Sequence, residues 1–180
     1  MRARASCLVL AVCLLLMEAP GRAQSAIRVT PLPRDGVLLV TFELSGGVPD
    51  EMLAAIHSGL AITFSYDVDL RRGVPFWIDR TIATAHVAAS VRYDNLTRRH
   101  QLSRMLDGRT EPDATVTENE DLVTRWLTSF ERLPLFSTDL LEANSEYYVR
   151  IRARTQPHST WALWPWGGGT WGLAKFTFLP

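Results

Sequence analysis

Cysteine is nearly absent from this chain. Its 180 residues include two cysteines, Cys7 and Cys13, which both lie within the first 23 residues. The rest of the chain has no thiol, so a cysteine nucleophile, a disulfide and a cysteine metal ligand are excluded there. Small domains in oxidising compartments often depend on disulfides. We therefore expect this domain to be held together by its apolar core alone.

A long hydrophobic run is also missing. The N-terminal apolar segment, Cys7–Met17, has eleven residues and is too short to span a bilayer stably. Arg2 and Arg4 precede it, and small residues follow it as far as Ala23, which is the layout of a secretory signal peptide. The alternative is that this run is a buried core helix. We expect residues 1–23 to be a signal peptide.

Cleavage after Ala23 leaves residues 24–180, which is enough for one domain with a sizeable core. Cleavage after Ser25 or Ala26 also fits the pattern. The absence of cysteine from this domain favours a bacterial periplasmic protein over a eukaryotic secreted one. We expect no transmembrane segment after cleavage.

The chain carries no excess of one charge. It has 19 basic and 19 acidic residues, and residues 1–23 hold three arginines and one glutamate, which leaves 16 against 18 and a formal net charge of −2. Domains that bind nucleic acid are typically basic, so we expect no such partner. The GxSxG, HExxH, P-loop and dinucleotide-binding motifs are absent too. We expect no cofactor and no enzymatic activity.

Alternating apolar and polar residues predict most of the secondary structure. The strongest pattern, Thr81–Arg104, indicates two strands joined by a tight turn at Asp94-Asn95, because such residues tolerate a left-handed backbone. Leu60–Arg72 and Tyr147–Arg154 alternate as clearly. Weaker patterns predict strands at Ile27–Thr30 (stopped by Pro31 and Pro33, which suit an edge strand), Val37–Leu44 and Leu173–Leu179.

Two helices are expected between these strands. Pro49 opens a short one that Gly59 ends. Thr117-x-x-Glu120 is a capping box that predicts a second helix over roughly Glu118–Arg132, closed by Leu133-Pro134. About seven strands with one or two short helices packed on them favour an antiparallel β-sandwich, immunoglobulin-like in type.

The histidines and two aspartates are candidate catalytic or metal-binding groups. Depending on the turn length, His100 faces position 87, 89, 90 or 91 on the opposite strand, out of register with His86, so we expect no shared metal ion. Asp67 and Asp69 lie two apart on one strand face and suit a hydrolase with paired carboxylates. The alternative is that they are solvent-facing charges paired with neighbouring arginines such as Arg71.

Two segments are candidate binding surfaces. The first holds four tryptophans within eleven residues, Trp161, Trp164, Trp166 and Trp171. Such aromatics form protein-binding hot spots, sugar platforms or membrane anchors, or they cap one end of a sandwich. The second is the polar face of the strand at Tyr147–Arg154, which carries Arg150, Arg152 and Arg154 and is either a solvated face or an anion-binding surface.

Several motifs together resemble one family of exported bacterial proteins. They are Tyr66–Arg72, Trp77-x-Asp79, Val91–Arg98, Trp126-Leu127, Leu133–Leu135 and Tyr147–Arg150. The family is catalogued as domain of unknown function 4390. The resemblance implies a proteobacterial, extracytoplasmic protein and brings no known activity, cofactor or catalytic residue. Its association with genes for a membrane sensor kinase implies a signalling partner.

These features favour a non-enzymatic protein-interaction module in the periplasm whose partner is a periplasmic or membrane protein. A small-ligand or glycan-binding domain is the alternative. A hydrolase that uses Asp67 and Asp69 is a third hypothesis, from another class.

Overall fold

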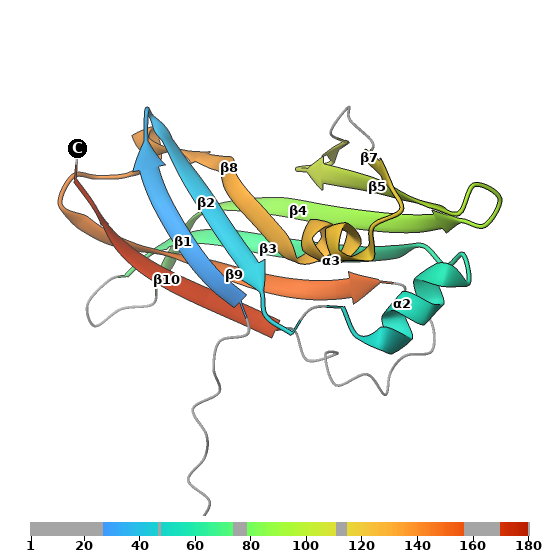
Figure 1. The fold of residues 1–180 in the computed structure, drawn as a ribbon. Coiled ribbons are helices and arrows are strands. Elements are labelled where there is room, and N and C mark those ends of the chain that lie inside the picture. Colours follow the sequence, from blue (N-terminus) through green and yellow to red (C-terminus); the bar gives the residue numbers. More distant parts are fainter. Residues whose placement is uncertain (1–26, 47, 74–78, 111–114, 157–169, 180) are drawn as a thin grey trace, which may run out of the picture.

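The computed structural model describes residues 27–46, 48–73, 79–110, 115–156 and 170–179. They form two antiparallel sheets and two α-helices (Figure 1). The small sheet has the order β1-β2-β8, with β1 (Ile27–Arg34), β2 (Val37–Leu44) and β8 (Ser129–Ser137).

The large sheet contains seven strands in the order β10-β9-β3-β4-β5-β6, with β7 also paired to β5. Their bounds are β3 (Ile62–Arg72), β4 (Arg80–Asp94), β5 (Arg99–Leu106), β6 (Arg109–Thr110), β7 (Thr115–Thr117), β9 (Ser145–Gln156) and β10 (Thr170–Phe178). The antiparallel two-sheet arrangement is confirmed. The expected number of strands was too low, because the described residues form ten.

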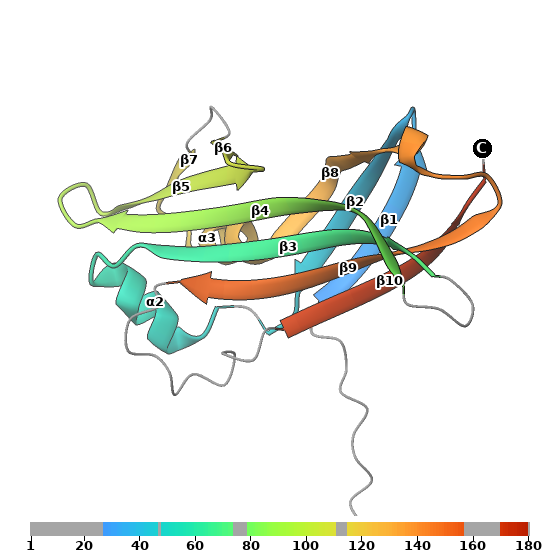
Figure 2. The same ribbon diagram turned by 180° about the vertical axis from the view of Figure 1, so that it is seen from behind.

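Elements of the described residues cover one face of the large sheet and not the other. The small sheet and the helices α2 (Asp50–His57) and α3 (Glu120–Thr128) lie over the same face (Figure 1), where the core forms. Figure 2 shows the opposite face, over which no element of the described chain lies. The alternation predicted for β3, β4 and β9 is confirmed, since one side of each strand is buried in the core.

The two sheets come closest where β1 passes β10. A Cβ atom added to Gly172 on β10 would lie 2.3 Å from the backbone oxygen of Ile27 on β1. Ile27 is itself buried. Glycine is therefore required at position 172 by this close approach of two backbones.

The N-terminal hairpin differs from expectation at its prolines. β1 is not stopped at Pro31 but runs through Pro33 to Arg34, and as expected it is an edge strand of its sheet. An edge strand tolerates proline because half of its backbone N–H groups have no strand to bond. Asp35 and Gly36, with φ of 52° and 79°, form the turn into β2.

The second helix is shorter than predicted and begins with a different cap. Asn119, not Thr117, is its N-cap, and its side-chain oxygen accepts a hydrogen bond from the backbone N–H of Leu122 at 3.1 Å. The helix ends at Thr128. The residues from Ser129 to Arg132, which were expected to be helical, instead begin the strand β8. The prediction that Leu133-Pro134 ends the helix is wrong, because Pro134 lies within β8 beside a register irregularity.

The turn of the central hairpin is also displaced. Four residues, Asn95 to Arg98, separate β4 from β5, and Arg98 has the left-handed backbone, with φ of 57°. The Asp94 side chain accepts hydrogen bonds from the backbone N–H groups of Leu96 and Thr97, at 2.9 and 3.4 Å, and these bonds stabilise the turn. His100 consequently pairs with Tyr93, which none of the predicted registers gives.

Candidate functional site

The uncovered face of the large sheet carries two rows of aligned side chains. One row runs across four strands as Trp171, Arg152, Asp67 and His86, and the next runs as Leu173, Arg150, Asp69 and Thr84. Residues paired across strands point to the same side of a sheet. We call the outward side chains of the last two strands the β9–β10 face: Tyr148, Arg150, Arg152, Arg154, Trp171, Leu173 and Lys175.

The predicted arginine stripe is present, but its members differ in their partners. Arg150 binds the carboxylate of Asp69, with 2.6 Å between Nη2 and Oδ2, and Arg154 binds Asp67 at 3.0 Å. The exposed Arg152 side chain makes no ion pair or side-chain hydrogen bond within the described chain. Within the described residues, Arg152 is therefore the arginine of the stripe without an ion pair, although Asp67 lies opposite it on β3.

Trp171 is the one predicted tryptophan that the described residues include; Trp161, Trp164 and Trp166 lie outside them. Its side chain stands directly across from Arg152 on the neighbouring strand and is 58 % exposed. Leu173, in the next row, is 40 % exposed. Tryptophan and arginine are both enriched among the residues that contribute most of the binding energy at protein–protein interfaces.

The two carboxylates proposed for hydrolysis are both engaged by neighbours. Asp67 is bound by Arg154 and by His86 Nδ1, the latter at 2.9 Å. Asp69 accepts hydrogen bonds from Arg150 and from Thr84. Burial raises the pKa of Asp69, but these hydrogen bonds and the nearby arginines outweigh it, so the pKa lies below its ordinary value. A carboxyl group in this state is a poor general acid.

A polar cluster borders the arginine stripe near the start of β9. The Tyr148 hydroxyl donates a hydrogen bond to the Asp79 carboxylate, and Arg71 donates to the Asp79 backbone oxygen at 3.0 Å. Burial and the bond to Asp79 together raise the pKa of Tyr148. This cluster fixes the segment before β4 against β9, and it leaves Tyr148 protonated at neutral pH.

The histidines do not converge on a shared site. His86 lies on the uncovered face, whereas His100 is buried on the opposite side beside the rings of Tyr93 and His57, at centroid distances of 4.9 and 5.5 Å. His158 lies outside the described residues. In the part of the chain that is described, no group of three or more histidine, cysteine or acidic residues has the arrangement of a metal site.

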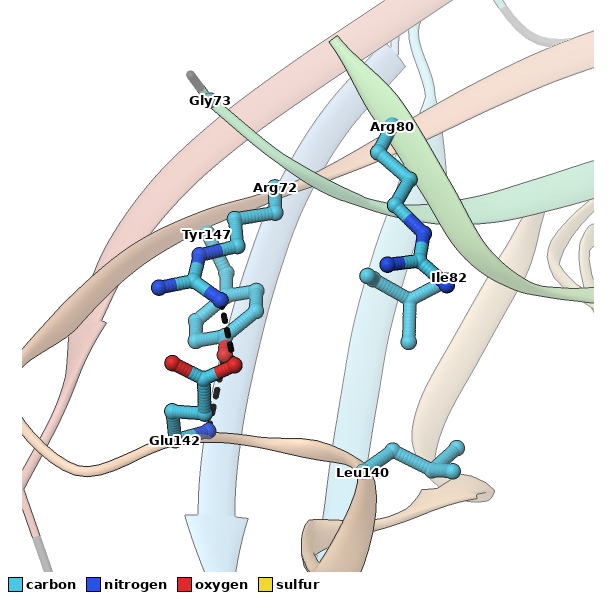
Figure 3. A pocket seen from close by; sticks show the side chains of 7 residues that line it. All are labelled: Arg72, Gly73, Arg80, Ile82, Leu140, Glu142 and Tyr147. Carbon is cyan, nitrogen blue, oxygen red and sulfur yellow. Dashed lines mark hydrogen bonds and ion pairs between the residues drawn. The ribbon is translucent and has the colours of Figure 1, made fainter. Parts of the chain in front are cut away.

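Sequence patterns gave no sign of a groove that opens at one end of the sandwich (Figure 3). It has a volume of about 600 Å³ and is lined by Arg72, Gly73, Arg80, Ile82, Leu140, Glu142 and Tyr147. These residues come from the end of β3 and the glycine after it, the start of β4, the 3₁₀ turn Thr138–Leu140, the connection that follows this turn, and the start of β9. Such a site depends on tertiary packing, and no local motif predicts it.

Comparison with known proteins gives one match. The model of a family described as a domain of unknown function, DUF4390, matches residues 24–159. No curated protein and no solved structure matches the chain. Neither helix of the described residues is long and apolar enough to cross a membrane.

Proposed function

The chain belongs to the DUF4390 family, and from its geometry we propose that it is an exported protein that acts by binding another protein and not by catalysis. The proposed location is the periplasm of a proteobacterium, and the proposed partner is a periplasmic or membrane protein. A membrane sensor kinase is the partner that the family resemblance suggests. The family match begins at residue 24, directly after the expected cleavage position, which supports a leader outside the domain.

The observation that carries this proposal is the uncovered β9–β10 face. Apolar contact area from Trp171 and Leu173 lies beside the cation of Arg152. Arg150 and Arg154 are held by Asp69 and Asp67, so they order the surroundings of Arg152. In this proposal the two sheets serve as in immunoglobulin-like domains, as a rigid scaffold for a binding surface.

The complementary partner surface follows from this chemistry. It presents a carboxylate to Arg152, because a guanidinium binds carboxylates through paired hydrogen bonds. It also presents apolar groups that cover Trp171 and Leu173. The occupied state of Asp67 and Asp69 supports a binding role over a hydrolytic one.

The test is capture of the partner by the tagged full chain in the bacterium that produces it, with quantification by mass spectrometry. We compare the wild type with Arg152→Glu and with the matched control Arg92→Glu, an exposed arginine on β4 of the same uncovered face. Arg152→Glu should reduce recovery of the specific partner about tenfold or more. Arg92→Glu should leave it unchanged. Equal recovery with all three chains would reject the β9–β10 face as the binding surface.

A second candidate function, binding of a small ligand, is favoured by the groove at the end of the sandwich. Its volume of about 600 Å³ lies within the range of known ligand pockets. The groove and the β9–β10 face use opposite sides of β9, since Tyr147 is buried toward the core and Arg152 is exposed. The two functions can therefore be tested separately.

A further inference from the structure

The charges that line the groove do not cancel. Arg72 forms an ion pair with Glu142 through Nη1, and its Nη2 donates to Ser145 Oγ at 3.2 Å. The nearby arginine lowers the pKa of Glu142, chiefly through their hydrogen bond, so this carboxylate is ionised at neutral pH. Arg80 also helps to lower the pKa of Glu142 through its charge, but its exposed side chain makes no ion pair or hydrogen bond in the described chain. Two arginines thus share one carboxylate, which leaves the lining with an excess of one positive charge.

The two arginines lie on different sides of the groove. In Figure 3, Arg72, Glu142 and Tyr147 form one side, and Arg80 stands with Ile82 on the other. The Tyr147 hydroxyl accepts a hydrogen bond from the Glu142 backbone N–H at 2.8 Å, and its ring lies under Arg72 at 5.9 Å. Arg72 and Glu142 are thus fixed parts of the wall, while Arg80 is the open cationic group.

The remaining lining is apolar. Ile82 is half-buried, and Leu140 exposes 47 % of its surface although it is a large hydrophobic residue. Both line the groove beside Arg80. Apolar side chains together with a small number of placed polar groups are the usual composition of a small-molecule site.

We propose that this groove binds a small organic monocarboxylate with an apolar body. Arg80 pairs with the carboxylate, and Ile82 and Leu140 contact the apolar body. One available guanidinium balances one negative charge, and a guanidinium fork matches the two oxygens of a carboxylate. This inference deepens the second candidate function and does not depend on the β9–β10 face.

The test uses octanoate as the probe, below its micellar concentration, with the full chain and isothermal titration calorimetry. Octan-1-ol has the same apolar body without the charge, and acetate has the charge without the body. We expect saturable binding of octanoate that is at least about tenfold tighter than that of either control compound. Equal binding of octanoate and octan-1-ol, or no binding of octanoate, would overturn the proposal.

Variants locate the site. Arg80→Gln removes the charge and breaks no hydrogen bond or ion pair of the described residues. It should weaken octanoate binding about tenfold, whereas Arg92→Gln should not change it. Methyl NMR signals of Ile82 and Leu140 should shift on titration of octanoate into the wild type. Unchanged binding by Arg80→Gln, or the absence of these shifts, contradicts the assignment. Arg80 is not part of the β9–β10 face, so Arg80→Gln should capture the protein partner as the wild type does. Loss of octanoate binding and loss of partner capture can therefore be told apart.

Discussion

Arg150 on β9 binds Asp69 on β3 with two guanidinium nitrogens, Nη2 at 2.6 Å and Nε at 3.3 Å from the same carboxylate oxygen. The side chains are 33 % and 20 % exposed, so water screens this pair only in part. The pair joins two neighbouring strands on the uncovered face. It also removes Arg150 from the groups available to a partner and Asp69 from those available for acid catalysis.

Replacement of Asp69 by asparagine should therefore destabilise the fold in a pH-dependent manner. The pKa of Asp69 is lowered in the folded state, so the stabilisation is present above the ordinary carboxyl pKa of about 4 and is lost as the pH falls through the folded value. Asp69→Asn should cost about 1 kcal/mol at pH 7. Urea unfolding should show this gap closing toward pH 3.

The matched control for this prediction is Asp35→Asn, since Asp35 is 84 % exposed and pairs with Arg34 on the surface. It should change the free energy of unfolding very little. A gap between the wild type and Asp69→Asn that is the same at pH 7 and pH 3 would contradict the role of the ion pair.

His100 should make stability fall on mild acidification. Its imidazole is buried, and neither ring nitrogen has a hydrogen-bond partner in the described residues. Burial lowers the pKa of His100, with a smaller opposing effect of the Thr117 backbone across the strand pair, and His57 nearby lowers it further. The unfolded chain therefore takes up a proton first as the pH falls below about 6.5, and the folded state loses stability.

His100→Phe should remove this pH dependence, because phenylalanine packs against Tyr93 and His57 without a titrating group. Chemical unfolding at pH 7.5 and pH 5.5 measures the slope. An unchanged slope in His100→Phe would show that the buried imidazole does not cause it.

Gly172→Ala should destabilise the contact between the two sheets. The added methyl group would meet the Ile27 backbone at 2.3 Å, and a backbone cannot yield as a flexible side chain does. Overpacking of this kind costs about 1–3 kcal/mol. Thermal unfolding should show a lower Tm, whereas Gly73→Ala, whose Cβ would meet nothing within 4 Å, should unfold as the wild type does.

Arg104 should be important for the position of the second helix. Its guanidinium on β5 donates to the backbone oxygens of Trp126 at 3.0 Å and Ser129 at 2.8 Å, where α3 ends and β8 begins. Its guanidinium carbon also lies over two rings, 4.2 Å from the centroid of Trp126 and 4.3 Å from that of Phe130. Arg104→Met leaves both carbonyl groups without this donor and should cost about 2–4 kcal/mol in denaturant unfolding.

The control for this prediction is Arg99→Met on the same strand, where Arg99 is exposed and pairs with Glu118. It should cost less than about 1 kcal/mol. Equal effects of the two substitutions would contradict the proposed anchoring of α3 by Arg104.

The long strands were predictable because period-two alternation in β3, β4 and β9 records directly which side faces the core. The strand that follows α3 could not be predicted in this way. Phe130 continues the helical apolar stripe, and Pro134 argues against a strand on local grounds. β8 forms nevertheless because it is an edge strand with register irregularities, where a proline needs no donor.

The candidate sites, too, could be predicted from the sequence only in part. The stripe Arg150, Arg152 and Arg154 followed from alternation, but their partners did not: Asp69 binds Arg150 directly opposite it, whereas Asp67 lies opposite Arg152 and binds its diagonal neighbour Arg154. The groove around Arg80 depends on strand ends and a 3₁₀ turn that meet only in the folded chain. Sequence patterns of local range carry neither piece of information.

The most direct test of the account is photo-crosslinking in living producer cells, with a photoreactive amino acid at position 171 of the full chain. Position 116 on β7, which is also exposed and lies toward the opposite edge of the large sheet from β10, is the control. The account predicts a discrete protein adduct from position 171 that Arg152→Glu abolishes, and none from position 116. No adduct at position 171, or one that persists in Arg152→Glu, would contradict it.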